Sequence, residues 1–416
     1  MLQKKKTKNR ILIALSAVGP GLFLIGYNIG TGSITTMAKA GAEYGMTLFW
    51  ALILSCLFTW ILMVAYGQMT LTSGNTALYN IKSSIKGGKI LAIYIIIALI
   101  IGELLALMGI MGIVAELVQE GIRLISGTRG LVVDTFWIIL VFAVLLYFLL
   151  WYGRYKMFEK VLTVFVILMA LCFIAVFVMV RPSISAIFEG MVPGIPETTG
   201  AFRLIAAMAG TTCSAAVFIM RSTVVAEKGW TIKDLKKEKK DAFTSAAMML
   251  FLSGIIMAVS AGTLHIMGLK LDTTVEMIRL FEPLGGQAAA FLLILGITGA
   301  GLSTIFPIVL IAPWLISDFT GRPRDIRSPL YRVLILAGLF FAFGTIFINQ
   351  TPPIIMVFSQ AFQAAILPAV AIPVFILLNN RNVMNSNLPS MRMNAGLIAV
   401  IIFSLITTYF AILGFI

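Results

Sequence analysis

Two groups of small polar residues interrupt apolar stretches of this 416-residue chain, and their side chains could bind an ion or a polar solute. The first group is Gly30-Thr31-Gly32-Ser33, and the second is Gly210-Thr211-Thr212-Cys213-Ser214. Hydroxyls, a thiol and the carbonyls of an unwound backbone can all act as ligands. In lipid, a broken helix persists only where it is buried in protein or lines a cavity. The two groups are therefore predicted to form a binding centre.

Four further residues in or beside apolar segments extend this candidate centre. Asn28 and Gln360 add amides, whereas Glu103 and Arg221 are ionisable groups that are costly to bury in a membrane and therefore indicate function. Glu103 is interpreted as a proton site, a cation ligand or half of a structural pair. Arg221 either faces the cavity as a permanent charge or extends to the cytoplasmic end of its helix.

Each of these polar residues also has a purely structural interpretation. Ser and Thr in membrane helices commonly bond their own backbone or a neighbouring helix, and Gln360 can do the same. A lone cysteine such as Cys213 is more often a packing residue than a ligand. The coincidence of hydroxyls with both interruptions is what favours binding.

The composition defines the class of protein that must position these residues. Hydrophobic residues make up 60% of the chain and charged residues 12%, with a mean hydropathy of +1.03. Apolar runs long enough to span a bilayer recur throughout, which predicts an all-α polytopic membrane protein. The short alternating segments of a β-barrel are absent. No nucleophile–base set, metal cluster, phosphate loop or disulfide framework is present, so neither an enzyme nor a cofactor is expected.

Eleven hydrophobic segments are predicted, and basic residues orient them. Twenty-three of the 31 Lys and Arg residues fall in the segments that are cytoplasmic when the N-terminus is inside, and five fall outside. This bias predicts a cytoplasmic N-terminus, an external C-terminus and a cell (inner) membrane location. The net charge of +14 therefore reflects topology and not nucleic-acid binding. The segments are 11–40, 47–73, 90–117, 133–150, 158–180, 203–227, 241–266, 286–317, 331–348, 353–378 and 394–416.

The order of the segments suggests two five-helix halves and one extra helix. The interrupted segments are the first and the sixth, so each opens one half, as inverted-repeat transporters require. The predicted parts are a cytoplasmic segment 1–10, a first repeat 11–180 broken near 28–33, an outer loop 181–202, a second repeat 203–378 broken near 210–214, and an inner loop with a last helix 379–416.

Short motifs along the chain resemble those of the Nramp family of divalent metal transporters. They are Gly19-Pro20-Gly21, Gly41-Ala42-Glu43-Tyr44-Gly45, Met157-Phe158-Glu159-Lys160, Gly190-Met191-Val192-Pro193, Gly301-Leu302-Ser303-Thr304, and Ser359-Gln360 followed by Leu367-Pro368. The resemblance covers nearly the whole chain. It implies the leucine-transporter fold and alternating access.

The resemblance also implies that the family's metal site is rebuilt here. The family's Asp-Pro-Gly-Asn motif falls on Gly30–Ser33, so that Gly30 replaces the Asp and Ser33 the Asn. The Met and His of the family's sixth helix are missing, and a later His of that helix aligns with Arg221. Acidic residues linked to proton movement fall on Ile110 and Ile113, while Glu103 is kept.

The function expected from these residues is secondary transport with weak or absent proton coupling. A hydrated or hard divalent cation such as Mg²⁺ or Mn²⁺ is the expected substrate, because such ions keep waters and need few direct ligands. The alternative is a small polar or carboxylate-bearing organic solute, and a sensor or scaffold without flux is a third interpretation. The expected partners are the transported solute and the lipid bilayer.

Overall fold

The structure is a computed structural model that describes residues 30–126, 133–152, 155–322 and 325–415. These residues form helices and connecting loops without any strand. Eight helices are long and apolar enough to cross a membrane, and Thr135–Trp151 and Val166–Val180 are shorter apolar helices. The prediction of an all-α polytopic membrane protein is confirmed. The first predicted segment enters the described part only at Gly30, so Asn28 lies outside the described residues.

The described helices are divided here into two sets, which lie before and after the loop at residues 190–198. The first set comprises α3 (Thr31–Tyr44), α4 (Phe49–Ser73), α5 (Ala77–Ser84), α6 (Gly88–Ser126), α7 (Thr135–Trp151), α8 (Tyr155–Val180) and α9 (Ile184–Glu189). The second comprises α10 (Thr199–Thr212), α11 (Ala215–Glu227), η2 (Ile232–Asp234), α12 (Leu235–Ser260), η3 (Ala261–His265), α13 (Thr274–Ile278), η4 (Arg279–Leu284), α14 (Gly286–Thr320), α15 (Pro329–Phe341), α16 (Gly344–Phe347), α17 (Pro352–Ile366), α18 (Pro368–Leu378), α19 (Arg381–Met384) and α20 (Met391–Phe415).

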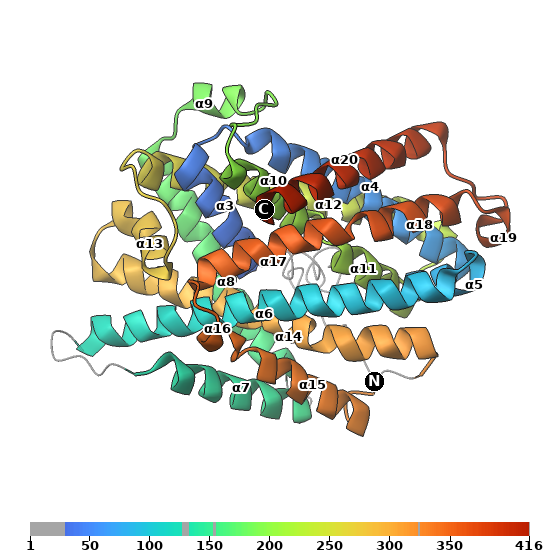
Figure 1. Cartoon of the computed structure of the whole chain (residues 1–416), viewed down its shortest axis with the longest axis horizontal. Coiled ribbons are helices and arrows are strands. Elements are labelled where there is room, and N and C mark those ends of the chain that lie inside the picture. The colour runs from blue at the N-terminus through green and yellow to red at the C-terminus, as the bar shows by residue number, and fades with distance from the viewer. Residues whose placement is uncertain (1–29, 127–132, 153–154, 323–324, 416) are drawn as a thin grey trace, which may run out of the picture.

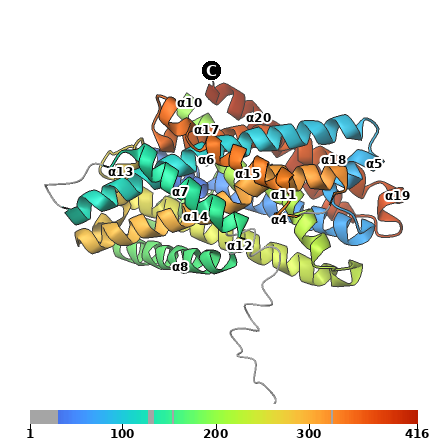
Figure 2. The same cartoon turned by 90° about the horizontal axis from the view of Figure 1, so that it is seen from below.

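The helices α3, α10 and α17 pack against one another in the centre of the molecule. The surrounding helices α4, α6, α12 and α14 contact this group, so its side chains are shielded from the periphery. The long helices run roughly along one axis, with α13 at one end of the molecule and α5 and α19 at the other (Figures 1 and 2). Helix α13 therefore lies at the end of the molecule opposite to α5 and α19.

A described helix boundary falls within each predicted interruption, although part of each predicted break is helical. Helix α3 begins at Thr31 with Gly30 as its N-cap, so residues 31–33 are helical. Helix α10 continues through Thr212, and only Cys213 and Ser214 separate it from α11. Gly210–Thr212 remain helical because their backbone groups are paired within α10, which leaves a two-residue break.

Gly210 allows the close approach of α10 and α17. An added Cβ at this position would overlap the backbone carbonyl oxygen of Gln360 and lie 2.9 Å from the Ala364 nitrogen. Small residues permit such backbone approach between membrane helices. Gly210 is therefore a packing residue of the helix pair that carries Thr211 and Gln360.

We expect the variant Gly210→Ala to lose stability, because the methyl group meets backbone that cannot move independently. The cost is about 1–3 kcal/mol, typical of an overpacked core. Thermal unfolding of the purified protein in detergent measures it. Gly194→Ala is the matched control, since a Cβ there meets no atom within 4 Å. Equal unfolding temperatures for the two variants would contradict this explanation.

Candidate functional site

A small internal cavity lies where the two helix breaks meet. It encloses about 30 Å³, which holds a water-sized guest. Its lining comes from α3, α6, α10, α14 and α17, together with the residues that flank α3 and α11. The lining residues are Gly30, Gly32, Ser33, Glu103, Ala106, Ile110, Thr211, Ser214, Thr304, Ile308, Met356, Gln360 and Gln363.

A hydrogen bond joins the two interrupted segments directly at this cavity. Ser33 Oγ and Thr211 Oγ1 lie 3.0 Å apart, although 178 positions separate them in sequence. Ser214, the N-cap of α11, lines the same space. The start of α3 and the junction of α10 with α11 therefore lie at the same cavity.

Glu103 brings a carboxylate to the cavity from the middle of α6. Its side chain is buried, and Oε1 accepts a hydrogen bond of 2.8 Å from Gln363 Nε2 of α17. This bond orients the Gln363 amide, so the carbonyl oxygen Oε1 becomes the free end of that side chain. Among the described residues, that oxygen is buried and has no hydrogen-bond partner. A carboxylate and an amide oxygen, both typical ligands of hard cations, thus lie at one cavity.

Several predicted binding residues lie beside the cavity without lining it. Thr212 donates to Met208 O at 2.5 Å, and its own carbonyl accepts from Thr59 Oγ1 at 2.9 Å. Cys213 is fully buried, and its backbone amide bonds to Ala209 O. Thr31 packs against Gly301 of α14, where an added Cβ would lie 2.9 Å from Thr31 Oγ1. These three residues, like Gly210, contribute to helix packing.

Arg221 neither faces the cavity nor extends to the surface. The residue has no exposed surface, and Nη2 lies 2.7 Å from Glu238 Oε1 and 3.1 Å from Asp241 Oδ2 of α12. Both predicted alternatives for Arg221 are therefore wrong. A buried guanidinium needs carboxylate partners, and the start of α12 folds back against α11 to supply them.

The sequence matches the family model "Natural resistance-associated macrophage protein-like" over residues 21–414. The chain belongs to the Nramp family. Two curated relatives are divalent metal cation transporters named MntH. The one from Pectobacterium carotovorum subsp. carotovorum is 24% identical over 380 residues, covering 90% of this chain and 88% of the relative. The one from Yersinia enterocolitica is 26% identical over 298 residues, covering 70% of each chain.

Solved structures with the same fold include Nramp and non-Nramp transporters. A crystal structure of the Eremococcus coleocola manganese transporter aligns with a TM-score of 0.73 and 14% identity, covering 98% of this chain and 88% of that chain. Mhp1, a nucleobase-cation-symport-1 family transporter in a closed conformation, aligns with a TM-score of 0.60 and 16% identity over 95% of this chain. The predicted leucine-transporter-type fold is confirmed. Because the Nramp family consists of transporters, the prediction that the chain is not an enzyme is confirmed as well.

Three lining residues of this Nramp protein that carry a polar group or sulfur, Thr304, Met356 and Gln363, were not predicted as site residues. Met356 and Gln363 lie four residues before and three residues after Gln360, so helical periodicity from Gln360 would have found both. Thr304 lies inside the motif Gly301-Leu302-Ser303-Thr304, which served only as a mark of family resemblance. Because 60% of the residues are hydrophobic, the apolar surroundings of these three residues in the sequence did not distinguish them as buried.

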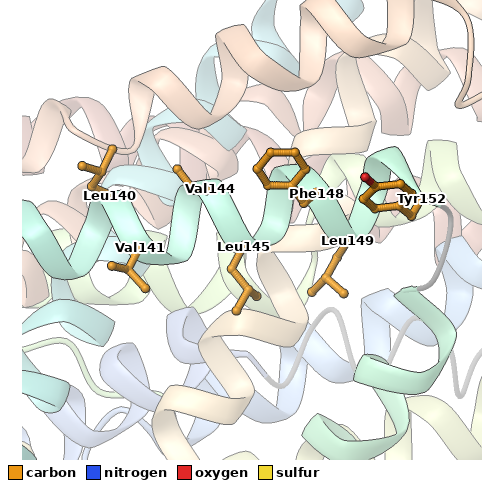
Figure 3. A pocket seen from close by; sticks show the side chains of 7 residues that line it. All are labelled: Leu140, Val141, Val144, Leu145, Phe148, Leu149 and Tyr152. Atoms are coloured by element: carbon orange, nitrogen blue, oxygen red, sulfur yellow. The ribbon is translucent and has the colours of Figure 1, made fainter.

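A larger hollow on the outer face of α7 differs from the central cavity in chemistry. It spans about 610 Å³ and is lined by Leu140, Val141, Val144, Leu145, Phe148, Leu149 and Tyr152. Figure 3 shows a row of hydrocarbon side chains in which the Tyr152 hydroxyl is the sole side-chain oxygen. Such a surface suits the acyl chains of the bilayer and offers no ligands for an ion.

We expect the Arg221–Glu238 pair to give a strongly non-additive double-mutant cycle. Arg221→Gln alone leaves the Glu238 carboxylate buried without its guanidinium partner, a loss of about 3–5 kcal/mol for a broken buried pair. Adding Glu238→Gln removes that buried charge and recovers part of the loss. Thermal unfolding of the four proteins measures the coupling. Additive losses would mean that the two side chains stabilise the fold independently.

Proposed function

We propose that this Nramp-family protein is a secondary transporter that moves a hard or hydrated divalent cation, such as Mg²⁺ or Mn²⁺, by alternating access. The function of the MntH relatives and the manganese transporter supports a divalent cation as substrate. The observation that carries the proposal is the pairing of the Glu103 carboxylate with the free Gln363 carbonyl oxygen at the cavity. A cation accepts electron pairs from both groups.

The size of the cavity favours an ion over an organic solute. Pockets that enclose drug-sized organic ligands typically measure about 300–1,000 Å³, whereas this cavity encloses about 30 Å³. In the conformation described, the cavity has room for a guest the size of one water molecule or one small ion. The alternative of a polar organic solute would require a much wider cavity in another state of the cycle.

The ligand set supports weaker binding of transition metals than in relatives with the usual motif. Gly30 and Ser33 supply no carboxylate or amide at the start of α3, and Glu103 is the carboxylate among the lining residues. Met356 adds one polarizable thioether from α17. Hydroxyls and amides dominate the remaining ligands, and these suit Mg²⁺ and Mn²⁺.

The charge arrangement supports weak or absent proton coupling. The two positions where the family resemblance places proton-path acids are Ile110, which lines the cavity, and Ile113, which is fully buried. Neither side chain has a group that can bind or release a proton. Arg221 is permanently charged and paired with Glu238. Glu103 is the remaining candidate for a coupling group.

The proposed site and orientation follow the sequence prediction. The protein lies in the cell (inner) membrane with the N-terminus in the cytoplasm and the C-terminus outside. The repeats 11–180 and 203–378 move relative to each other around Ser33, Thr211, Ser214, Gln360 and Glu103.

We expect proteoliposomes containing the full-length protein to accumulate Mg²⁺ and Mn²⁺ in preference to amino acids, carboxylates and nucleobases. Glu103→Gln should lower cation uptake about tenfold or more, because charged hydrogen bonds and ligands contribute about 1.5–3 kcal/mol. Glu120→Gln is the matched control, since Glu120 lies on the same helix outside the cavity. A pH-sensitive dye inside the vesicles reports coupling in the same experiment.

Saturable uptake of an organic solute without cation uptake would overturn the proposal. Proton entry in fixed ratio with the cation would overturn weak coupling alone. If Glu103→Gln then removed proton entry while cation binding persisted, Glu103 would be the coupling group.

We expect Gly30→Asp to raise Mn²⁺ affinity only when Thr304 is also shortened. A Cβ at Gly30 would overlap Thr304 Oγ1 and lie 2.9 Å from its Cγ2. Gly30→Asp alone should therefore destabilise the protein, and Gly30→Asp with Thr304→Ala should fold and bind Mn²⁺ at least tenfold more tightly, through an added anionic ligand. Calorimetry measures the affinity, with Thr304→Ala as the control. Unchanged Mn²⁺ affinity in a folded double variant would place the ion elsewhere.

A further inference from the structure

Lys39 is a buried ammonium that joins α3 to a loop at the end of the molecule occupied by α13. The residue is 4% exposed, and Nζ lies 2.5 Å from Asp272 Oδ1, 3.0 Å from Leu271 O and 2.6 Å from Glu43 Oε1. An ammonium buried to this degree requires such partners. Two of its three partners belong to the loop, which follows η3 and leads into α13.

The same loop is bonded to α17 and to the start of α13. Thr351, the N-cap residue of α17, donates to Asp272 O at 2.5 Å. The Glu276 carboxylate accepts from the backbone amides of Asp272 and Thr273 at 2.6 and 2.8 Å. Residues 271–273, here named the strap, are thus held rigidly between α3 and α17.

The strap joins two helices that both line the central cavity. Ser33 lies six residues before Lys39 on α3, and Met356 lies five residues after Thr351 on α17. Because a helix rises 1.5 Å per residue, the strap lies about 7–9 Å along each helix from the lining residues. Any separation of α3 from α17 at this end must break the contacts of the strap.

Glu43 can remain the counter-ion of Lys39 after the strap has separated from α3, so the strap can leave and return. Glu43 lies one turn after Lys39 on the same helix and accepts from its ammonium at 2.6 Å. When the strap leaves, Lys39 keeps Glu43 as its counter-ion, so no isolated charge is created. Asp272, whose side chain is 48% exposed, then turns to solvent. Two discrete arrangements of one ion pair can thus distinguish a closed from an open cavity.

We propose that the Lys39–Asp272 pair is a latch that closes the binding cavity toward the α13 end of the molecule. In the closed state, the Lys39 ammonium contacts Asp272, the Leu271 carbonyl and Glu43. In the open state, it contacts Glu43 alone. The latch acts on access to the cavity. It does not depend on which solute the cavity binds, so it can fail or succeed independently of the cation proposal.

The test measures how fast a thiol in the cavity reacts from each side of the membrane. The reporter is Ser33→Cys in the full-length chain, with Cys56, Cys172 and Cys213 replaced by Ala. A membrane-impermeant methanethiosulfonate reagent is applied to intact cells and to inverted vesicles. Val275→Cys on α13 and Tyr79→Cys on α5, which are 50% and 49% exposed, identify the two sides.

Asp272→Asn should speed labelling of the reporter at least tenfold from the side that labels Val275→Cys, and not from the side that labels Tyr79→Cys. Glu43→Gln is the matched control, because it also removes one carboxylate from Lys39 but leaves the strap attached, and it should not speed labelling. Thr351→Val removes the hydrogen bond between the strap and α17 and should give a smaller increase in labelling rate on the same side. Unchanged labelling in both Asp272→Asn and Thr351→Val, or equal acceleration by Asp272→Asn and Glu43→Gln, would overturn the latch.

Discussion

The pairing of backbone groups within an apolar environment is the constraint on which this structure depends. Two helices end inside the protein, and each end is satisfied locally. The Cys213 amide bonds to Ala209 O, the Thr212 carbonyl accepts from Thr59 Oγ1, and the Ile34 amide bonds to Gly30 O. Because these bonds limit the break between α10 and α11 to two residues, Ser214 at that break and Ser33 near the start of α3 converge on one small cavity.

The buried cationic side chains, like the buried backbone groups, are paired with nearby partners. Arg221 is neutralised by Glu238 and Asp241 at one end of the bundle, and Lys39 by Glu43 and Asp272 at the other. Glu103 lies between them, bonded to the neutral amide of Gln363. The two cations thus bind segments together away from the cavity, whereas the Glu103 carboxylate lines the cavity itself. This arrangement agrees with a cation substrate.

Glycines at the centre of the molecule shape the cavity. The space beside Gly30 is filled by Thr304 of α14. Gly32 and Gly109 leave room for the Met356 side chain of α17 between α3 and α6. The polar lining residues therefore come from several helices, with Glu103 on α6, Gln360 and Gln363 on α17, and the others on α3, α10 and α14 and at the start of α11.

The amino-acid sequence was enough to predict the class of fold, the break between α10 and α11 to within a few residues, and the polar character of the centre. Hydropathy, glycine placement and the spacing of hydroxyls are local properties, so they can be read directly from the chain. Only the tertiary structure decided which polar residues share the cavity. Thr211 and Thr212 are adjacent, yet one lines the cavity and the other bonds backbone. Glu103, Gln363 and Arg221 obtain their partners from helices 17 to 260 residues away in sequence, and helix packing alone sets such distances.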